Sequence, residues 1–169
     1  MRKGFSIVEV LGATLIMGVC ISGMISAWSY TFNKAGNSRD LATASEVARA
    51  EIERAKVFGY EFMPKGSYDS SNNVGTWEGS FNTAANSGTG AWAANQGKFY
   101  SHDGQILNSA AGAKFQLSLK LTDTEVMASS QGGYELGSTA KRTLVATVKK
   151  LPEDQPFVVM ATILAKGGL

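Results

Sequence analysis

The residues with the clearest potential for chemistry lie within the first ten positions of the chain. Gly4 and Phe5 follow two cations, and an isolated carboxylate stands further on, at Glu9. Glu9 is the only charged side chain between residues 7 and 32. An ionised side chain at the centre of a bilayer costs about 2.5–3.5 kcal/mol on insertion scales, so a carboxylate kept in such a run indicates an interaction partner.

The other polar residues form no recognisable catalytic or metal-binding set. His102 is the single histidine, and Ser101 and Asp103 flank it. Side chains adjacent in sequence diverge and cannot align as nucleophile, base and orienting acid, so we predict a turn at residues 102–104. One histidine and one cysteine, Cys20, provide no zinc-binding constellation. We therefore expect no enzymatic activity, no metal site and no cofactor.

The N-terminal pattern closely resembles the class III signal of type IV prepilins and pseudopilins. The resemblance rests on Gly4 followed by Phe5, on Glu9, and on the valine and leucine residues beside Glu9. In that family a membrane aspartyl peptidase cleaves after the glycine and methylates the new N-terminal residue. This implies prepilin peptidase cleavage between Gly4 and Phe5 and N-methylation of Phe5. Glu9 becomes the fifth residue of the mature chain, where the family's glutamate guides filament assembly.

A long apolar segment follows this motif. The run from residue 7 to residue 32 exceeds the roughly 20 residues that a membrane-spanning helix needs. Arg2 and Lys3 precede it, so the positive-inside rule places the N-terminus in the cytoplasm and the remainder outside. The alternatives are a secretory signal cleaved near Ser26 or Ala27, and an uncleaved single-span anchor. A prepilin signal differs from a secretory one because its apolar helix is retained after cleavage.

Helical periodicity continues beyond the apolar segment. Between residues 37 and 60 apolar side chains recur at steps of three and four along one helical face: Leu41, Ala44, Ala48, Ile52 and Ala55. Charged residues occupy the other face, and Gly59 and Pro64 predict the end of the helix. Because no proline occurs before Pro64, we expect one continuous helix of about 50 residues.

The middle of the chain is rich in glycine, serine and asparagine. Over residues 65–113 this composition predicts turns and long connections. Bulky side chains such as Trp77 and Trp92 indicate that the region packs onto something. We predict a partly ordered connecting region with one or two short strands, near residues 97–100 and 105–107.

Strand patterns become clear in the last third of the chain. Apolar and polar residues alternate over residues 114–122 and again over 142–149. A Gly- and Ser-rich connection over residues 128–138 separates them, and an apolar, β-branched run covers 157–164. Three such strands have one apolar face that needs a cover, which the amphipathic helix supplies.

The predicted fold is therefore α+β. A long N-terminal α-helix, with a membrane half and an amphipathic half, packs on an antiparallel β-sheet head of three to five strands. The type IV pilin resemblance implies the same architecture. The predicted parts are a leader (1–4), a transmembrane or filament-core helix (5–32) and an extracytoplasmic head (33–169). Within the head we expect the amphipathic helix 33–60, the connecting region 65–113 and the β-sheet 114–169.

Charge gives little support to nucleic-acid binding. The chain has 16 Lys and Arg against 14 Asp and Glu. Removing a leader that contains Arg2 and Lys3 takes the 16 cations to 14, so the mature chain is balanced. A local basic cluster surrounds one predicted strand and consists of Lys141, Arg142, Lys149 and Lys150. We interpret it as a solvated strand edge guarded by cations. The alternative is a surface contact to DNA or another anionic surface.

Two features depart from the common pattern of the family. Cys20 is the single cysteine, so the head contains no intramolecular disulfide, whereas many pilins close a C-terminal loop with one. Ser26 stands where major pilins and several pseudopilins carry a proline. The opening residues also resemble PilV-like minor pilins and the minor pseudopilins of type II secretion.

These patterns predict a structural subunit of a type IV pilus or a type II secretion-like filament. We expect a minor pilin or pseudopilin that aids filament initiation or assembly. Its partners would be other pilins, the prepilin peptidase and the inner-membrane assembly platform. It would be a single-pass protein of the inner membrane and later part of a periplasmic or cell-surface filament. The alternatives are a major pilin, a DNA-binding competence pseudopilin or tip adhesin that uses Trp77 and Trp92, and a simple anchored envelope domain.

Overall fold

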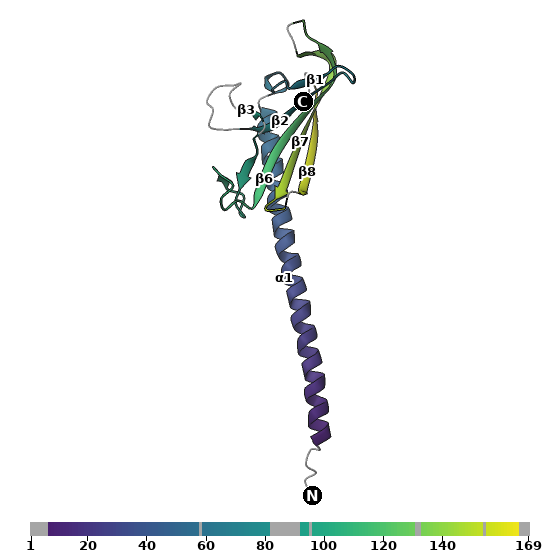
Figure 1. The fold of residues 1–169 in the computed structure, drawn as a ribbon, viewed down its shortest axis with the longest axis vertical. Coiled ribbons are helices and arrows are strands. Elements are labelled where there is room, and N and C mark those ends of the chain that lie inside the picture. The colour runs from purple at the N-terminus through teal and green to yellow at the C-terminus, as the bar shows by residue number, and fades with distance from the viewer. Residues whose placement is uncertain are drawn as a thin grey trace. The chain divides into compact units, whose positions relative to one another are not determined.

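The structure, a computed structural model, consists of a long helix followed by a β-sheet (Figure 1). It describes residues 7–57, 59–81, 92–94, 96–130, 133–153 and 155–165. The chain divides between Asp40 and Leu41 into two compact units. α1 (Ile7–Val57) is 51 residues long, and the predicted single long helix is confirmed. Gly59 adopts a φ of 79°, which favours glycine, and leads into the short 3-10 helix η1 (Tyr60–Phe62).

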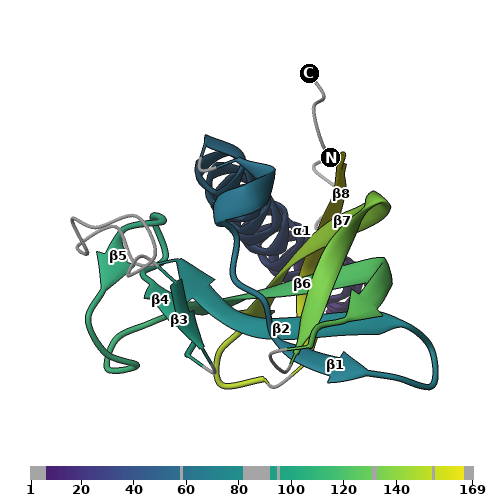
Figure 2. The same ribbon diagram turned by 90° about the horizontal axis from the view of Figure 1, so that it is seen from above.

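All strand pairs among the described residues are antiparallel. The strands are β1 (Ser67–Asp69), β2 (Val74–Phe81), β3 (Trp92–Ala94), β4 (Lys98–Tyr100), β5 (Ile106–Leu107), β6 (Phe115–Ala128), β7 (Tyr134–Lys150) and β8 (Pro156–Leu164). β6 lies at the centre, with β7 along one side of it and β8 beyond β7. On its other side β4 and β2 pair with successive parts of β6, and the short strands extend this half (Figure 2).

The three strands with clear sequence patterns are confirmed, and so are the predicted buried faces of β6 and β7. Every second residue of β6 from Phe115 to Leu121 is at most 1% exposed. In β7 the same holds for Leu144, Ala146 and Val148. The short strands β4 and β5 also lie where they were predicted.

The prediction for residues 65–113 was wrong in its number of strands, because five strands lie in this region among the described residues. The sheet accordingly has eight described strands rather than three to five. The glycines that indicated loops instead make room for aromatic rings within the sheet. A Cβ at Gly75 would lie 2.3 Å from the ring of Tyr134, and one at Gly79 would lie 2.6 Å from the ring of Trp77.

The predicted connection over residues 128–138 is shorter in the structure. β6 continues to Ala128 and β7 begins at Tyr134, beyond a register shift between Thr124 and Val126. Glu125 has a φ of 60° at this irregularity, and a bulge of this kind increases the local twist. The extended hairpin carries a small apolar cluster of its own, made of Val126, Tyr134 and Ala140 with Tyr68 and Leu136.

The main core lies between one face of the sheet and the last turns of α1. Ala44, Ala48 and Ala55 are completely buried there, together with Val47 and Ile52. Leu41, which the pattern placed on the same face, is instead 48% exposed. Three alanines give the helix a small surface where it packs in one core with the leucine side chains of β6, and a core at native packing density leaves little room for larger residues.

This packing predicts that Ala48→Leu destabilises the head by about 1–3 kcal/mol, because added methyl groups force the core apart. Ala50→Leu is the matched control, since Ala50 is an exposed residue of the same helix. It should change stability by less than about 0.5 kcal/mol. Urea unfolding of the detergent-solubilised chain, followed by near-ultraviolet circular dichroism, measures both. Equal effects of the two substitutions would contradict the helix–sheet packing.

Candidate functional site

The structure places one of the three N-terminal motif residues. Gly4 and Phe5 lie outside the described residues. Glu9 lies in the first turn of α1 and is exposed. It is the only charged residue between Ile7 and Asn33, so the helix presents a single carboxylate near the start of a long apolar surface.

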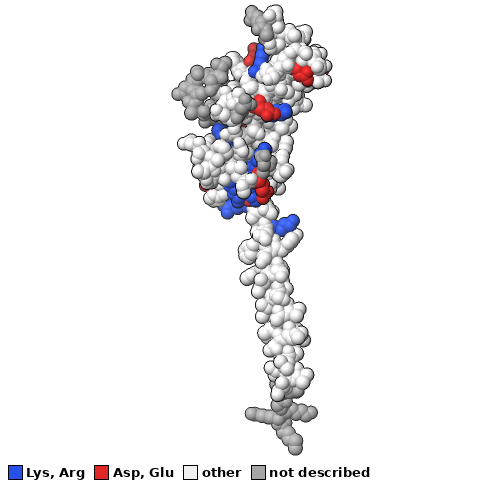
Figure 3. Space-filling view, in the orientation of Figure 1, with Lys and Arg blue, Asp and Glu red and all other residues white. Residues whose placement is uncertain are grey.

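The apolar side chains that follow Glu9 are exposed. Between Ile7 and Phe32 the large hydrophobic residues are 51–79% exposed, and this part of α1 is almost free of charge (Figure 3). An 18-residue window has a mean hydropathy of 2.0 and is 0% buried within the protein. Soluble monomers rarely expose an apolar surface of this size. The helix is long and apolar enough to cross a membrane.

Four hydroxyl groups in this segment are hydrogen-bonded within the helix. Thr14, Ser22, Ser26 and Thr31 each donate a hydrogen bond of 2.9–3.0 Å to a backbone carbonyl three or four residues earlier. In an apolar environment a polar group without a partner costs several kcal/mol, on the order of 4–8 for transfer to a hydrocarbon. These four side chains bring no unpaired donor into such an environment, and Glu9 is the one charged side chain of the segment.

The predicted basic cluster does not form one surface in the structure. β7 pairs with β6 on one side and β8 on the other, so it is not an edge strand, and the interpretation as a guarded edge was wrong. Arg142 is 0% exposed and is unavailable to a surface partner. Lys141 is exposed and Lys149 is half-buried near the other end of the strand. Lys150 lies 5.6 Å from the ring centroid of Phe157.

The tryptophans of the predicted adhesive surface pack against each other. Trp77 is 8% exposed, and its ring meets that of Trp92 edge to face, with centroids 5.4 Å apart. A base or sugar ring cannot stack on Trp77 without displacing the core. These residues therefore stabilise the head, and they lend no support to the binding-module alternative.

The buried cation is part of a polar network that sequence reasoning missed. Arg142 Nε and Nη2 donate to the two carboxylate oxygens of Asp123 at 2.8 and 3.0 Å. Its Nη atoms also donate to the carbonyls of Tyr60, Met63 and Pro64, at 2.6–3.3 Å. The Tyr134 hydroxyl donates to Asp123 at 2.6 Å. Asp123 falls on the buried parity of β6, and this position was the one sequence signal for the network.

A second buried carboxylate lies on the helix. Glu51 is 0% exposed and accepts hydrogen bonds from the Tyr100 hydroxyl at 2.7 Å and from Lys98 at 3.0 Å. Arg54 pairs with the same oxygen at 2.5 Å. Burial raises the pKa of Tyr100 well above its ordinary value, and the adjacent Glu51 carboxylate raises it further. These bonds join α1 to β4, so the cluster holds the head together.

Burial also raises the pKa of Tyr134, to about 12, and its hydrogen bond to Asp123 acts in the same direction. Both phenols are therefore protonated at neutral pH and serve as donors. Tyr100 is hydrogen-bonded to Glu51, and Tyr134 to Asp123 and the Gly66 amide, so these contacts include no histidine and no nucleophile. Their chemistry is that of structural hydrogen bonds.

The segment around the single histidine forms a turn, as predicted. The amide of Gly104 donates to the carbonyl of Ser101 at 3.2 Å, and the Ser101 hydroxyl donates to Asp103. This hydrogen bond lowers the pKa of Asp103. Throughout the described part of the chain, no group of three metal-ligating side chains comes together.

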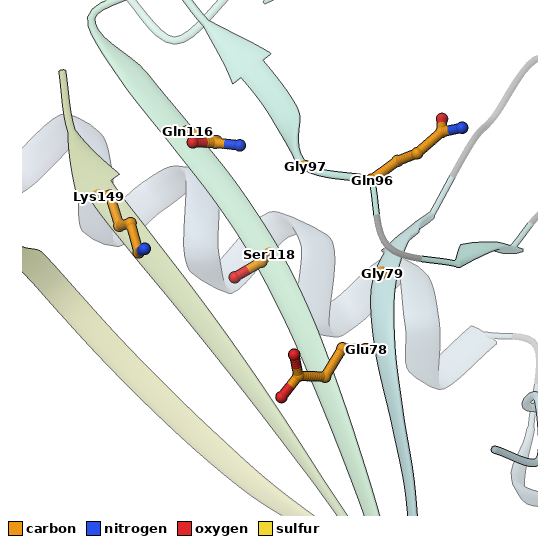
Figure 4. Close-up of a pocket in the computed structure, with 7 residues that line it drawn as sticks. All are labelled: Glu78, Gly79, Gln96, Gly97, Gln116, Ser118 and Lys149. Atoms are coloured by element: carbon orange, nitrogen blue, oxygen red, sulfur yellow. The ribbon is translucent and has the colours of Figure 1, made fainter. Parts of the chain in front are cut away.

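A shallow polar hollow lies on the sheet face opposite the core (Figure 4). β4 pairs with β6 as far as Leu117 and β2 pairs with it from Leu119, so Ser118 faces the break between them. The hollow has a volume of about 280 Å³ and is lined by Glu78, Gln116, Ser118 and Lys149 among others. A Cβ at Gly97 would lie 2.4 Å from Gln116. The hollow can hold a small polar group, but it contains no catalytic set.

No protein-family model, curated protein or solved structure matches this chain. The chain's own residues therefore carry the functional interpretation. The feature that stands out is the exposed apolar helix with one carboxylate near its beginning.

The Arg142 network predicts that Arg142→Met destabilises the head by about 3–5 kcal/mol, because Asp123 then stays buried without its counter-ion. Lys120→Met removes an exposed partner of Glu78 and should cost about 1 kcal/mol or less. Thermal unfolding of the two variants in one detergent gives the comparison. Similar losses in both would show that the buried pair is not a main support of the head.

The raised pKa of Tyr134 predicts a loss of stability in alkali. The unfolded phenol ionises near its ordinary pKa of 10.0, whereas the folded one keeps its proton to about pH 12. The free energy of unfolding should therefore fall as pH rises from 10 towards 12, because the unfolded state binds fewer protons. Tyr134→Phe should make this fall shallower than in the unsubstituted chain. An identical pH profile in the variant and in the unsubstituted chain would contradict the assignment.

Proposed function

We propose that this protein is a structural subunit of a type IV pilus or a type II secretion-like filament. Within that class we favour a minor pilin or pseudopilin that helps to initiate or assemble the filament. The observation that carries the proposal is Glu9, a lone carboxylate at the start of an otherwise uncharged helical surface. The Gly4-Phe5 pair ahead of it supports the same reading, since their spacing to Glu9 resembles the prepilin signal.

Maturation would begin with the prepilin peptidase. In the proposed sequence this enzyme cleaves between Gly4 and Phe5 and methylates the amine of Phe5. The new N-terminus then lies four residues from Glu9, and each subunit carries one cation and one anion at the same end of its helix. A carboxylate and an ammonium group attract strongly in a low-dielectric environment. We propose that Glu9 pairs with the N-terminal amine of a neighbouring subunit.

Location follows from the helix and its flanking charges. α1 can span a bilayer, and Arg2 and Lys3 favour a cytoplasmic N-terminus. The proposed subunit is thus a single-pass protein of the inner membrane, with its head outside, before it enters the filament. The assembly platform and its cytoplasmic ATPase would drive extrusion. Contacts with other helices would then replace contacts with lipid.

The two alternative functions, a major pilin and a DNA-binding or adhesive subunit, are not equally supported. A major pilin uses the same N-terminal chemistry, and abundance in sheared filaments distinguishes it from a minor subunit. The DNA-binding or adhesive reading depended on residues that are buried or dispersed, namely Trp77, Arg142 and the lysines of β7. The described residues of the head therefore lend no support to DNA binding or adhesion.

The proposal is tested by intact mass and N-terminal sequencing of the protein from its native membrane. We expect a chain that begins at N-methylated Phe5. Glu9→Ala should be processed normally and yet be absent from filaments, because the subunit then has no partner for the neighbouring amine.

Glu46→Ala is the matched control, since Glu46 is an exposed carboxylate elsewhere on α1. It should be both processed and incorporated. A chain that begins at Met1 would identify a plain membrane anchor instead. A chain that begins near residue 27 would identify a secreted domain, and either result would overturn the proposal.

A further inference from the structure

Three aromatic side chains lie on opposite sides of α1 near the end of its apolar segment. Trp28, Tyr30 and Phe32 are 65–69% exposed. The rings of Trp28 and Phe32 meet edge to face, with centroids 6.2 Å apart. Lys34 Nζ lies 5.6 Å from the centroid of Tyr30. We call these three aromatic residues the aromatic collar.

The collar occupies both sides of the helix. Successive residues of an α-helix are about 100° apart, so Trp28 and Phe32 share one side while Tyr30 and Lys34 lie on the other. A docking surface for one protein partner would gather its aromatic residues on a single face. Tryptophan and tyrosine that surround a helix, with lysine just beyond them, are instead typical of a membrane–water interface.

The distance from the collar to Glu9 matches the thickness of a bilayer. Trp28 lies nineteen positions after Glu9, which corresponds to about 28 Å along a helix. The hydrocarbon core of a typical bilayer is about 30 Å thick. When the collar lies at one interface, Glu9 therefore lies at the other.

We propose that α1 is held at a fixed depth in a phospholipid bilayer, with the collar among the outer headgroups and Glu9 at the cytoplasmic interface. The inference rests on the proposed membrane-spanning function and adds its register. Before assembly Glu9 remains hydrated at the cytoplasmic interface. Its carboxylate enters the low-dielectric core only when the helix moves outward, and pairing with an amine therefore matters most during that step.

Cys20 offers a direct test, because it is the single cysteine of the chain and is exposed. It lies about 17 Å from Glu9 and about 12 Å from Trp28 along the helix, so the proposed register places it near the bilayer centre. The full chain is reconstituted in phosphatidylethanolamine–phosphatidylglycerol vesicles and carries a nitroxide at Cys20. Matched samples carry it at Val10→Cys or Asn33→Cys in a Cys20→Ser background.

Collisions with oxygen and with a nickel chelate report the depth of each label. The ratio of oxygen to nickel accessibility should be highest at Cys20 and lower at both ends. A maximum at Val10→Cys would place Glu9 in the core and overturn the register. Alkaline carbonate extraction of the unlabelled protein tests separately whether the chain spans the membrane at all. A chain that carbonate releases does not span it, and this result would overturn both the register and the proposed function.

The collar's own contribution is tested by the joint substitution Trp28→Leu, Tyr30→Leu and Phe32→Leu. The helix then carries no aromatic side chain at residues 28, 30 and 32, and the accessibility maximum should shift from Cys20 toward a nitroxide placed at Met24→Cys in the Cys20→Ser background. Leu15→Ala is the control for a change within the core and should leave the maximum in place. An unshifted maximum in the triple variant would show that the collar does not set the depth.

Discussion

Arg142 joins three parts of the head that are far apart in the sequence. Its guanidinium pairs with Asp123 on β6 and also holds the carbonyls of the segment that follows α1. Tyr134 connects the same carboxylate to the extended hairpin. A guanidinium has five donors in a fixed plane and cannot lose its charge. Any arrangement that buries it must supply these acceptors together, which fixes the end of the helix relative to the sheet.

Charged side chains are arranged differently in the head and in the first part of α1. In the head, Arg142, Asp123 and Glu51 are buried and each has an ionic partner. Such pairs contribute little net stability over apolar residues, but breaking one is costly, so they favour a single arrangement. Between Ile7 and Asn33 the helix has Glu9 and no cation. A carboxylate without a counter-ion in its own segment leaves the pairing to another molecule, as the proposed assembly requires.

The sequence predicted the long helix, its end and the three main strands because these depend on local patterns. Alternation in β6 and β7 reports directly which side chains face the core. β1, β2 and β3 escaped prediction because the glycines of β2 act through close contacts that composition does not report: Gly75 lies against the ring of Tyr134 in β7, and Gly79 against Trp77 and the Ala93 carbonyl. Composition alone assigns such glycines to loops. The basic cluster was wrongly predicted to form one surface for a related reason. Neighbouring positions on a strand alternate between its two faces, and Arg142 faces the interior.

The hydroxyl groups of the apolar segment have a consequence for the way such helices recognise one another. From Val10 to Ala27 the serine and threonine hydroxyls donate to their own helix, so they do not act as donors between helices. Without hydrogen bonds between them, neighbouring apolar helices are held only by dispersion forces and steric fit. These forces change little in energy when one helix shifts along the other by one turn. Glu9, directly before this stretch, is the one charged side chain between Ile7 and Asn33, and its ionic contact can fix the axial position of one helix against the next. In the proposed filament, the axial stagger between the apolar helices of adjacent subunits would therefore be set by one ionic contact.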